Sequence, residues 1–320
     1  MFAVTTDPFV ASDLAGFIPE LWPGMILEEL FAKSIAANFF TDLTDAARNG
    51  GDIIHVPDVF TNAFTTQTQS TQGAEVTTAG PAQVDTTLTI NTHNYVAAII
   101  GDKDMTQLST SYDYNKVYTR KMAGNMRIAL EDSLFALWSG LSTNVIGDTA
   151  TVLSDAEIRQ GINSLEAINF DTLDGDTAFF FHPYVFFVQL GATAKYYDQS
   201  QRGPLQTAGF VATGQMGNGN NTAGLKGLLY GIPAYTSSRV ASGLQTYRNL
   251  LANKTAFGYA TQYLRTPGSS NLEGDRVRAQ SSYELRNIGW LTVVDIIFGT
   301  VELRDAAGVV LNASSTFIGS

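Results

Sequence analysis

The sequence predicts a mixed α+β fold, in which strands return over long distances and do not alternate regularly with helices. Three observations lead to this prediction. Apolar residues recur at helical spacing through residues 112–141, apolar and polar residues alternate through 84–93, and several short strand-like runs occupy residues 227–310. The sequence contains no internal repeat.

The composition is unusual for a chain of 320 residues. Only 15% of the residues are charged, against roughly 25% in an average globular protein, and the net charge is −11. Hydrophobic residues make up 44% of the chain, which excludes a disordered polyelectrolyte. The acidic balance argues against nucleic-acid binding through average charge. The absence of cysteine excludes disulfides, a thiol nucleophile and Cys-ligated metals.

The beginning of the sequence and its apolar runs bear on location. The first eight residues have neither a basic region nor a long apolar core, so no signal peptide is predicted. The longest apolar runs, such as 96–100 and 296–298, are far shorter than the ~20 residues that a membrane-spanning helix needs. We therefore expect a soluble protein, cytosolic or cell-free, with no membrane partner.

The first two predicted elements are a helix and a hairpin. Apolar residues from Met25 to Phe39 are spaced by three or four, as in an amphipathic helix, and residues 48–51 end it. Strands are predicted at 53–57 and 84–92, joined by a polar segment. Residues 52–95 contain eleven Thr and no Lys or Arg. Since a two-stranded hairpin is marginal alone, it should lie on another surface, and a neighbouring subunit is one candidate.

The longest predicted helix covers residues 112–141, with Gly124 as its one weak position. Arg120, Lys121 and Arg127 form a small basic patch on it. Pairing with acidic groups of another subunit explains this patch better than a weak nucleic-acid contact. Ser154 and Glu157 then form a capping box before another helix.

The remaining predicted elements are mostly strands. A buried strand at 177–181 precedes a helix that opens at His182 and Pro183, and residues 199–224 form a loop rich in Gly, Gln and Asn. The other predicted strands lie at 227–235, 255–261, 276–285, 290–298, 300–303 and 309–310.

The histidines support neither a metal site nor a catalytic triad. His55 and His93 fall on the two arms of the predicted hairpin and are candidate cross-strand neighbours, but zinc needs three or four ligands. His182 is interpreted as a helix-start residue. A Ser-His-Asp site has no Gly-x-Ser-x-Gly elbow to support it.

The other candidate motifs are equally weak. The sequence of residues 219–227 is close to the phosphate-binding loop motif. However, Leu225 occupies the position of the motif's Lys, and Gly227 occupies the position of its Ser or Thr. Asp102 and Asp104 fit a helix start better than an acid–base pair. The acidic pairs Glu28-Glu29 and Glu131-Asp132 are interpreted as parts of solvated or salt-bridged helix faces. No constellation supports catalysis, and no cofactor or metal is predicted.

The order of the elements resembles the major capsid proteins of tailed bacteriophages, whose shell fold is shared with encapsulins and herpesvirus capsid floor domains. The residues that carry the resemblance are Phe17-Ile18-Pro19-Glu20-Leu21-Trp22, Gly51-Asp52-Ile53-Ile54-His55-Val56-Pro57, Leu88-Thr89-Ile90-Asn91, Ile100-Gly101-Asp102-Lys103-Asp104, Ala129-Leu130-Glu131-Asp132 and the Gly-x-x-x-Gly-x-Pro run from Gly227 to Pro233. Together they span nearly the whole chain.

The resemblance implies a division of the chain into five segments. These are an N-terminal arm (1–48), an extended β-hairpin loop (49–100), a peripheral domain with a long spine helix (101–141), an α/β axial domain (142–270) and return strands of the peripheral domain (271–320).

The resemblance also implies a function. The protein would be a coat protein that assembles without catalysis, as pentamers and hexamers, into an icosahedral shell around packaged double-stranded DNA. It would be located in the virion and assembled in the host bacterial cytoplasm. Its partners would be other copies of itself, a separate scaffolding protein, a portal protein and a cement or decoration protein, with DNA touched only weakly and non-specifically. The candidate contact residues between subunits are Trp22, Phe31, Phe60, Phe64, Glu75, Arg120, Arg127, Arg202 and Met216.

Two departures from the family pattern carry further expectations. Some members join their subunits by Lys–Asn crosslinks through the extended loop, but no Lys occurs here between Lys33 and Lys103, so we expect no crosslink. Other members carry a long N-terminal scaffolding segment, for which the short stretch before the arm helix leaves no room. The alternatives are an encapsulin-like compartment shell, a β-rich phage surface or tail protein and, third, an enzyme.

Overall fold

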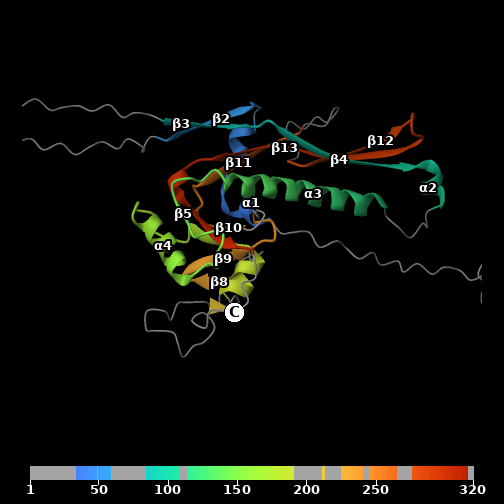
Figure 1. The fold of residues 1–320 in the computed structure, drawn as a ribbon. Coiled ribbons are helices and arrows are strands. Elements are labelled where there is room, and N and C mark those ends of the chain that lie inside the picture. The colour runs from blue at the N-terminus through green and yellow to red at the C-terminus, as the bar shows by residue number, and fades with distance from the viewer. Residues whose placement is uncertain are drawn as a thin grey trace, which may run out of the picture.

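The computed structural model describes residues 34–48, 50–58, 84–107, 114–190, 211–212, 225–240, 246–264 and 276–315. Their helices and strands form two sheets, a two-stranded ribbon and one long helix, so the predicted α+β class is confirmed (Figure 1). The helices are α1 (Ala36–Phe39), α2 (Asp102–Gln107), α3 (Tyr114–Leu137), α4 (Asp155–Glu166), the 3-10 turns η1 (Thr44–Ala47) and η6 (Asp305–Ala307), and the π-helix η2 (Val185–Leu190).

The five-stranded sheet is organised around one long strand. Its members are β1 (Thr41–Asp42), β4 (Thr92–Gly101), β11 (Phe257–Gln262), β12 (Arg278–Glu284) and β13 (Gly289–Glu302). Residues 289–295 of β13 pair with both β4 and β12, so these two strands flank it on opposite edges, and β11 pairs with residues 297–302. The predicted strands at 290–298 and 300–303 are therefore one continuous strand.

The long predicted helix is confirmed as α3, which runs along one face of this sheet (Figure 1). Its 24 residues span about 36 Å at 1.5 Å per residue. Met126 and Leu130 of α3 share a buried cluster with Val294 and Phe298 of β13. The helix and the sheet thus form one elongated layer pair that extends beyond the rest of the molecule.

The second sheet has seven strands. In spatial order they are β5 (Val145–Ile146), β14 (Gly308–Ser314), β10 (Thr246–Asn253), β6 (Thr177–Phe181), β9 (Ile232–Thr236), β8 (Leu225–Leu229) and β7 (Val211–Ala212). The strand β6 is buried on both faces, as its continuous apolar run predicted. Phe179 packs with Ile158 of α4 on one face, whereas Phe180 faces Trp138 at 5.6 Å between ring centroids on the other. Trp138, just after α3, therefore joins the two sheets.

Two local predictions are confirmed. The strands β2 (Ile53–Asp58) and β3 (Val84–Thr89) pair antiparallel as the arms of a hairpin, whose connection lies outside the described residues (Figure 1). The capping box at the start of α4 is formed, because Ser154 accepts from the Glu157 backbone and the Glu157 side chain accepts from Ser154.

Strand pairing differs from the predicted segments in three places. The strand β4, within the segment 49–100, belongs to the five-stranded sheet, and β14, within 271–320, belongs to the seven-stranded sheet. The predicted strand at 227–235 is a hairpin, because Tyr230 (φ 55°) and Gly231 (φ 87°) form a turn with two left-handed residues.

Two further predictions concern the start of the chain and the membrane. Of the helix predicted from Met25 to Phe39, residues 34–39 fall among the described residues, and Ala36–Phe39 are helical. In the described part of the chain, no helix combines the length and the hydropathy required to cross a bilayer.

Candidate functional site

The described chain begins with a segment, residues 34–48, that is held to the body by a buried carboxylate. Glu131 of α3 is 2% exposed. Its Oε1 accepts the backbone N–H groups of Ile35 (2.7 Å) and Ala36 (2.8 Å), and its Oε2 accepts that of Ala37 (3.3 Å). These are donors of the first turn of α1, which has no side-chain cap of its own. Glu131 therefore caps α1 from another helix.

This finding corrects the predicted solvated face of α3. Burial raises the pKa of Glu131, while the three N–H groups act to lower it and the charge of Asp132 raises it further. Asp132 itself is exposed and pairs with Arg239 at 2.9 Å, as expected of a salt-bridged face. The burial of Glu131 could have been predicted from its spacing in the sequence. It lies four residues before Phe135 and seven before Trp138, both buried, and therefore on the apolar side of the helix.

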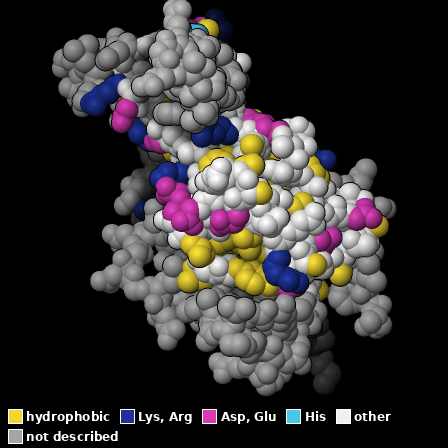
Figure 2. Space-filling view, turned by 90° about the vertical axis from the view of Figure 1, so that its left-hand side faces the viewer, with side chains coloured by type: hydrophobic (Ala, Val, Ile, Leu, Met, Phe, Trp, Pro, Cys, Tyr) yellow, Lys and Arg dark blue, Asp and Glu magenta, His cyan; other side chains and the backbone are white. Residues whose placement is uncertain are grey.

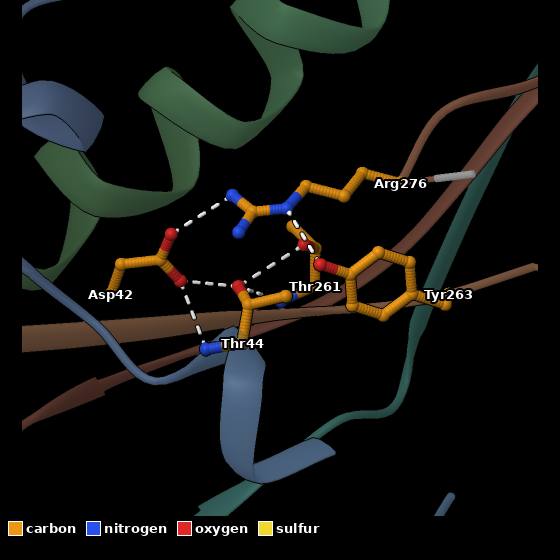
Figure 3. A network of polar contacts seen from close by, with 5 residues as sticks. All are labelled: Asp42, Thr44, Thr261, Tyr263 and Arg276. Carbon is orange, nitrogen blue, oxygen red and sulfur yellow. Dashed lines mark hydrogen bonds and ion pairs between the residues drawn. The ribbon is translucent and has the colours of Figure 1, made fainter. Parts of the chain in front are cut away.

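A second polar network, centred on Asp42 and Thr44, holds the segment near β1 (Figure 3). The Asp42 carboxylate accepts from the Thr44 amide (2.9 Å), from the Thr44 hydroxyl and from Arg276 Nη1 (2.9 Å). The Thr44 hydroxyl also accepts from the Thr261 amide of β11 (3.2 Å). Arg276 Nε donates to the Tyr263 hydroxyl at 3.5 Å. The network thus links residues 42–44 to β11 and to the approach to β12.

The electrostatics of this network favour its charged form. Burial acts to raise the pKa of Asp42, but hydrogen bonds from Thr44 and Arg276 outweigh it and hold the pKa below its usual value. The hydrogen bond to Tyr263 and the contact with Asp42 raise the pKa of Arg276 despite burial. Burial and the nearby Asp42 charge raise the pKa of Tyr259 to about 12.

Apolar packing between these two polar contacts completes the attachment. Phe39 and Phe40 both pack on Phe180 of β6, at 5.3 and 5.4 Å between ring centroids. Phe40 also meets Phe257 edge to face at 5.1 Å. The segment 34–48 is therefore fixed to both sheets and to α3. Its first residue, Ser34, is thereby held in place relative to the rest of the subunit.

The two histidines of the predicted hairpin are not cross-strand neighbours. His55 lies opposite Thr87 on the ribbon and contacts Asp85 at 2.6 Å. His93 lies opposite Ile297, because the chain leaves the ribbon after β3 and joins β13 as β4. There its Nε2 lies 3.0 Å from Asp295.

Asp295 is the centre of a charged row across three strands. Its side chain is 6% exposed and accepts from Arg278 of β12 through Nη2 (2.6 Å) and Nε (3.1 Å), as well as contacting His93 of β4. Burial acts to raise the pKa of Asp295, but the hydrogen bonds from Arg278 and His93 hold it below its usual value.

The described residues also include the candidate metal and catalytic groups of the sequence analysis. Within them, no group of three His, Asp or Glu could hold a metal ion. His182 accepts the Tyr184 amide at 3.2 Å and stacks on Tyr247, consistent with its predicted structural role. A mostly apolar pocket of about 220 Å³ has Arg304 as its only ionisable lining residue; the lining is Thr41, Leu43, Val56, Pro57, Thr86, Thr255, Leu303 and Arg304.

Of the nine candidate contact residues, the structure describes two. Arg120 and Arg127 are exposed on α3, two helical turns apart, and their role between subunits stays a prediction. The other seven lie outside the described residues: Trp22, Phe31, Phe60, Phe64, Glu75, Arg202 and Met216. Most of the loop at 199–224 lies outside them as well.

Exposed apolar side chains gather at two ends of the molecule. One end surrounds α4, where Val145, Val152, Ile168 and Leu173 are exposed, and hydrophobic side chains cluster on this face (Figure 2). The other is the turn between β12 and β13, at the opposite end of the long sheet (Figure 1), where Leu285 is 80% and Ile288 64% exposed. Sequence reasoning missed both, although Ile288, an apolar residue between the predicted strands 276–285 and 290–298, was a readable signal for the second.

Comparisons with known proteins show the fold. No known protein family and no curated protein matches the sequence. A solved structure of Mycobacterium phage Che8 matches with a TM-score of 0.70 at 16% identity, over 92% of this chain and 97% of that chain. The capsid of Cyanophage P-SCSP1u matches with a TM-score of 0.67 at 13% identity, over 95% of both chains.

An encapsulin matches almost as well. The SrpI encapsulin of Synechococcus elongatus PCC 7942 has a TM-score of 0.65 at 11% identity, over 98% of this chain and 99% of that chain. The chain therefore has the shell fold that phage capsids and an encapsulin share, as the resemblance implied.

Proposed function

We propose that this chain is the major capsid protein of a tailed bacteriophage. The observation that carries the proposal is the match of its fold, over more than nine-tenths of the chain, to structures from phages and to phage capsids. Because shell subunits act by self-association, the proposed role is structural and does not involve catalysis.

The surface of the subunit supports self-association. Only 15% of the residues are charged, and exposed apolar side chains occupy both the α4 end and the β12–β13 turn. Monomeric proteins rarely leave large apolar patches in water. If other copies cover these regions, the low charge and the apolar ends have one common explanation.

The finer features of the proposal follow the family. Copies would form pentamers and hexamers of an icosahedral shell, with packaged double-stranded DNA inside. The net charge of −11 would let the DNA move along the wall with only weak, non-specific contact. The protein would be assembled in the host bacterial cytoplasm and be located in the virion. A separate scaffolding protein, a portal protein and a cement protein are the proposed partners.

The proposal also assigns roles to the two sheets. The five-stranded sheet with α3 as spine helix would be the peripheral domain, and the seven-stranded sheet with α4 would be the axial domain. The proposed boundaries at residues 48, 100, 141 and 270 leave β4 in the extended-loop segment and β14 in the peripheral return segment, so their pairing would move β4 to the peripheral domain and β14 to the axial domain. The ribbon β2–β3 would be the base of the extended loop.

An encapsulin-like compartment shell is the second candidate, because the encapsulin structure is matched over almost the full length of both chains. The two candidates differ in what the shell encloses. Nuclease-protected DNA inside purified particles supports the phage capsid, whereas a co-purifying cargo protein supports the compartment. Neighbouring genes separate them too: portal and terminase genes accompany a capsid, and a peroxidase or ferritin-like gene accompanies a compartment.

Electron microscopy tests the proposal directly. The purified protein, alone and with a candidate scaffolding protein, is examined by negative staining and by light scattering. We expect icosahedral shells, formed at a uniform size only when the scaffolding protein is present. A persistent monomer under all conditions would contradict the shell function. Efficient assembly of correctly sized shells by the protein alone would contradict the separate scaffold.

A further inference from the structure

Residues 35–37 join the body of the subunit in a way that interrupts the helix predicted from Met25 to Phe39. In a continuous helix, their amides would donate to the carbonyls of residues 31–33. The three amides donate instead to the carboxylate of Glu131 on α3. The helix α1 is therefore separate from any helix before it, and other contacts must set the direction of the preceding chain.

The start of the described chain indicates this direction. Phe40 lies near the C-terminal end of α3, because both it and Trp138 pack on Phe180. Ile35 instead contacts Glu131, which precedes Trp138 by seven residues and so lies about 10 Å nearer to the N-terminus of α3. Traced backwards, the chain therefore runs toward the N-terminal half of α3, which extends past α1 (Figure 1).

Two arginines lie along this line on α3. Arg120 and Arg127, which we call the arginine pair, are both exposed. Steps of seven and four residues lead from Arg120 to Arg127 and on to Glu131, so the three residues share one face of the helix. Among the described residues, Arg127 forms no ion pair, and the sequence has no Asp or Glu from 114 to 130. The face is therefore positive and has no neutralising group of its own.

The chain before Ser34 matches the arginine pair in charge and in length. Residues 1–33 contain five acidic residues and one Lys. Glu28 and Glu29 precede Ile35 by seven and six residues, or about 10 Å in the helical conformation that the sequence predicts there. Measured along α3 from Glu131, the two arginines lie about 6 and 16 Å away. The acidic pair therefore falls between the two arginines, and the charges are complementary.

We propose that residues 25–33 dock along α3 of the same subunit, with Glu28 and Glu29 opposite Arg120 and Arg127. Docking continues the attachment that begins at Glu131, and it covers the arginine pair, so that neither acidic groups of other copies nor packaged DNA bind there. It replaces the role between subunits that was expected of these two arginines. The docking is a property of the free subunit and does not depend on shell formation.

Limited digestion with trypsin tests the docking in the free subunit. Lys33 is the first Lys or Arg of the sequence, so cleavage after it removes residues 1–33 in one step. The double variant Arg120→Gln, Arg127→Gln should raise the rate of this cleavage about five-fold, because two exposed ion pairs no longer hold the segment. An unchanged rate would overturn the proposal.

Matched variants show whether the effect belongs to this contact. Replacing two other exposed arginines, in Arg159→Gln, Arg248→Gln, should leave the rate unchanged. The variant Glu28→Gln, Glu29→Gln should raise the rate as much as the change at the arginine pair. Combining the acidic and the arginine changes should raise it no further, because both remove the same ion pairs. Additive increases would overturn the proposal.

Thiol crosslinking identifies what lies against the arginine pair. The chain contains no cysteine, so Ala32→Cys, Arg127→Cys introduces its only two thiols. A short bismaleimide should join them within one chain, which leaves a monomer on a denaturing gel and a peptide that contains both cysteines. In the control, Ala32→Cys, Asn125→Cys, the second thiol is exposed on the opposite side of α3 and should not be joined. Crosslinked dimers would assign the face to another copy, and an equal yield from the control, or no crosslink in either variant, would place the segment elsewhere. Each of these results would overturn the proposal, whether or not the chain forms shells.

Discussion

The Glu131 carboxylate lies against the backbone of Ala36, whose N–H it accepts at 2.8 Å across 95 residues of sequence. The same carboxylate accepts the amides on either side, so one side chain of α3 satisfies three donors of the first turn of α1. No cation pairs with this buried charge in the part of the chain that the structure describes. The attachment of the segment 34–48 therefore depends on hydrogen bonds from backbone dipoles.

Glu131→Ala should lower the free energy of unfolding of the subunit by about 3 kcal/mol, because three buried N–H groups lose their acceptor. Glu131→Gln should cost less than half of that, since its amide oxygen can still accept from Ile35 and Ala36 and no charge is buried. Urea-induced unfolding measures both values. Hydrogen exchange should become faster at residues 35–37 in the Ala variant. Equal losses in the two variants would show that the negative charge, not acceptor geometry, holds the segment.

The Asp42 network should make stability depend on acid pH. The pKa of Asp42 is lowered from 3.8 in the folded state, mainly because hydrogen bonds from Thr44 and Arg276 outweigh the effect of burial. Its contribution to stability is therefore complete above about pH 3.8 and is lost as the pH falls through the lower, folded-state value. We expect the loss of stability on acidification below this pH to be shallower in Asp42→Asn than in the unaltered chain.

The control for this prediction is Asp45→Asn, an exposed residue of η1. Urea unfolding at a series of pH values should give the same acid dependence for the control and the unaltered chain. Glu131 acts in the opposite sense, since its raised pKa means that its contribution is present below 4.5 and is lost as the pH rises through the folded-state value. An Asp42→Asn profile that parallels the unaltered chain would contradict the prediction.

Local patterns in the sequence predicted the elements with strong periodicity. The α3 helix, the buried strand β6 and the capping box at Ser154 each depend on neighbouring residues, so their signals are contained in short windows. The shell fold that the resemblance to phage capsid proteins implied is confirmed by structure matches at identities of 11–16%.

Local sequence patterns could not predict which residues pair across long distances in the sequence. Glu131 was interpreted as solvated because its partners, the amides 35–37, carry no side-chain signal at all. His93 was assigned to the hairpin because its strand is continuous in pattern with β3, although its partner β13 lies some 200 residues later. The exposed turn between β12 and β13 was missed in part because the left-handed backbone of Ile288 leaves no trace in hydrophobic periodicity.

Mature particles should contain no covalent crosslinks between subunits. An isopeptide bond needs a lysine amine, and no Lys occurs between Lys33 and Lys103, which includes the whole proposed extended loop. Boiling purified shells in SDS should therefore give one band near 34.5 kDa. Shells treated with an amine-reactive crosslinker serve as the control that higher bands are resolved. A ladder from untreated shells would contradict the prediction.

Arg278→Ala should destabilise the subunit by about 2 kcal/mol, because it leaves a buried carboxylate without its main partner. The Asp295 side chain is 6% exposed, and Arg278 donates to it through two nitrogens, whereas His93 contributes one contact at 3.0 Å. The three residues also join β4, β13 and β12, so the loss should appear in hydrogen exchange along β12. Urea unfolding at neutral pH measures the change in free energy.

The matched control is Arg159→Ala, which removes an exposed partner of Asp155 on α4, four residues away. The Arg159 side chain is 59% exposed, and Asp155 keeps the hydrogen bond from the Tyr230 hydroxyl when Arg159 is removed. Loss of this pair should therefore cost about 0.5 kcal/mol, far less than Arg278→Ala. Combining Arg278→Ala with Asp295→Asn should recover part of the loss, because the neutral amide removes the unpaired charge while keeping the shape of the side chain. Equal effects of the two arginine substitutions, or no recovery in the double variant, would contradict the assignment of Asp295 as a buried charge held by Arg278.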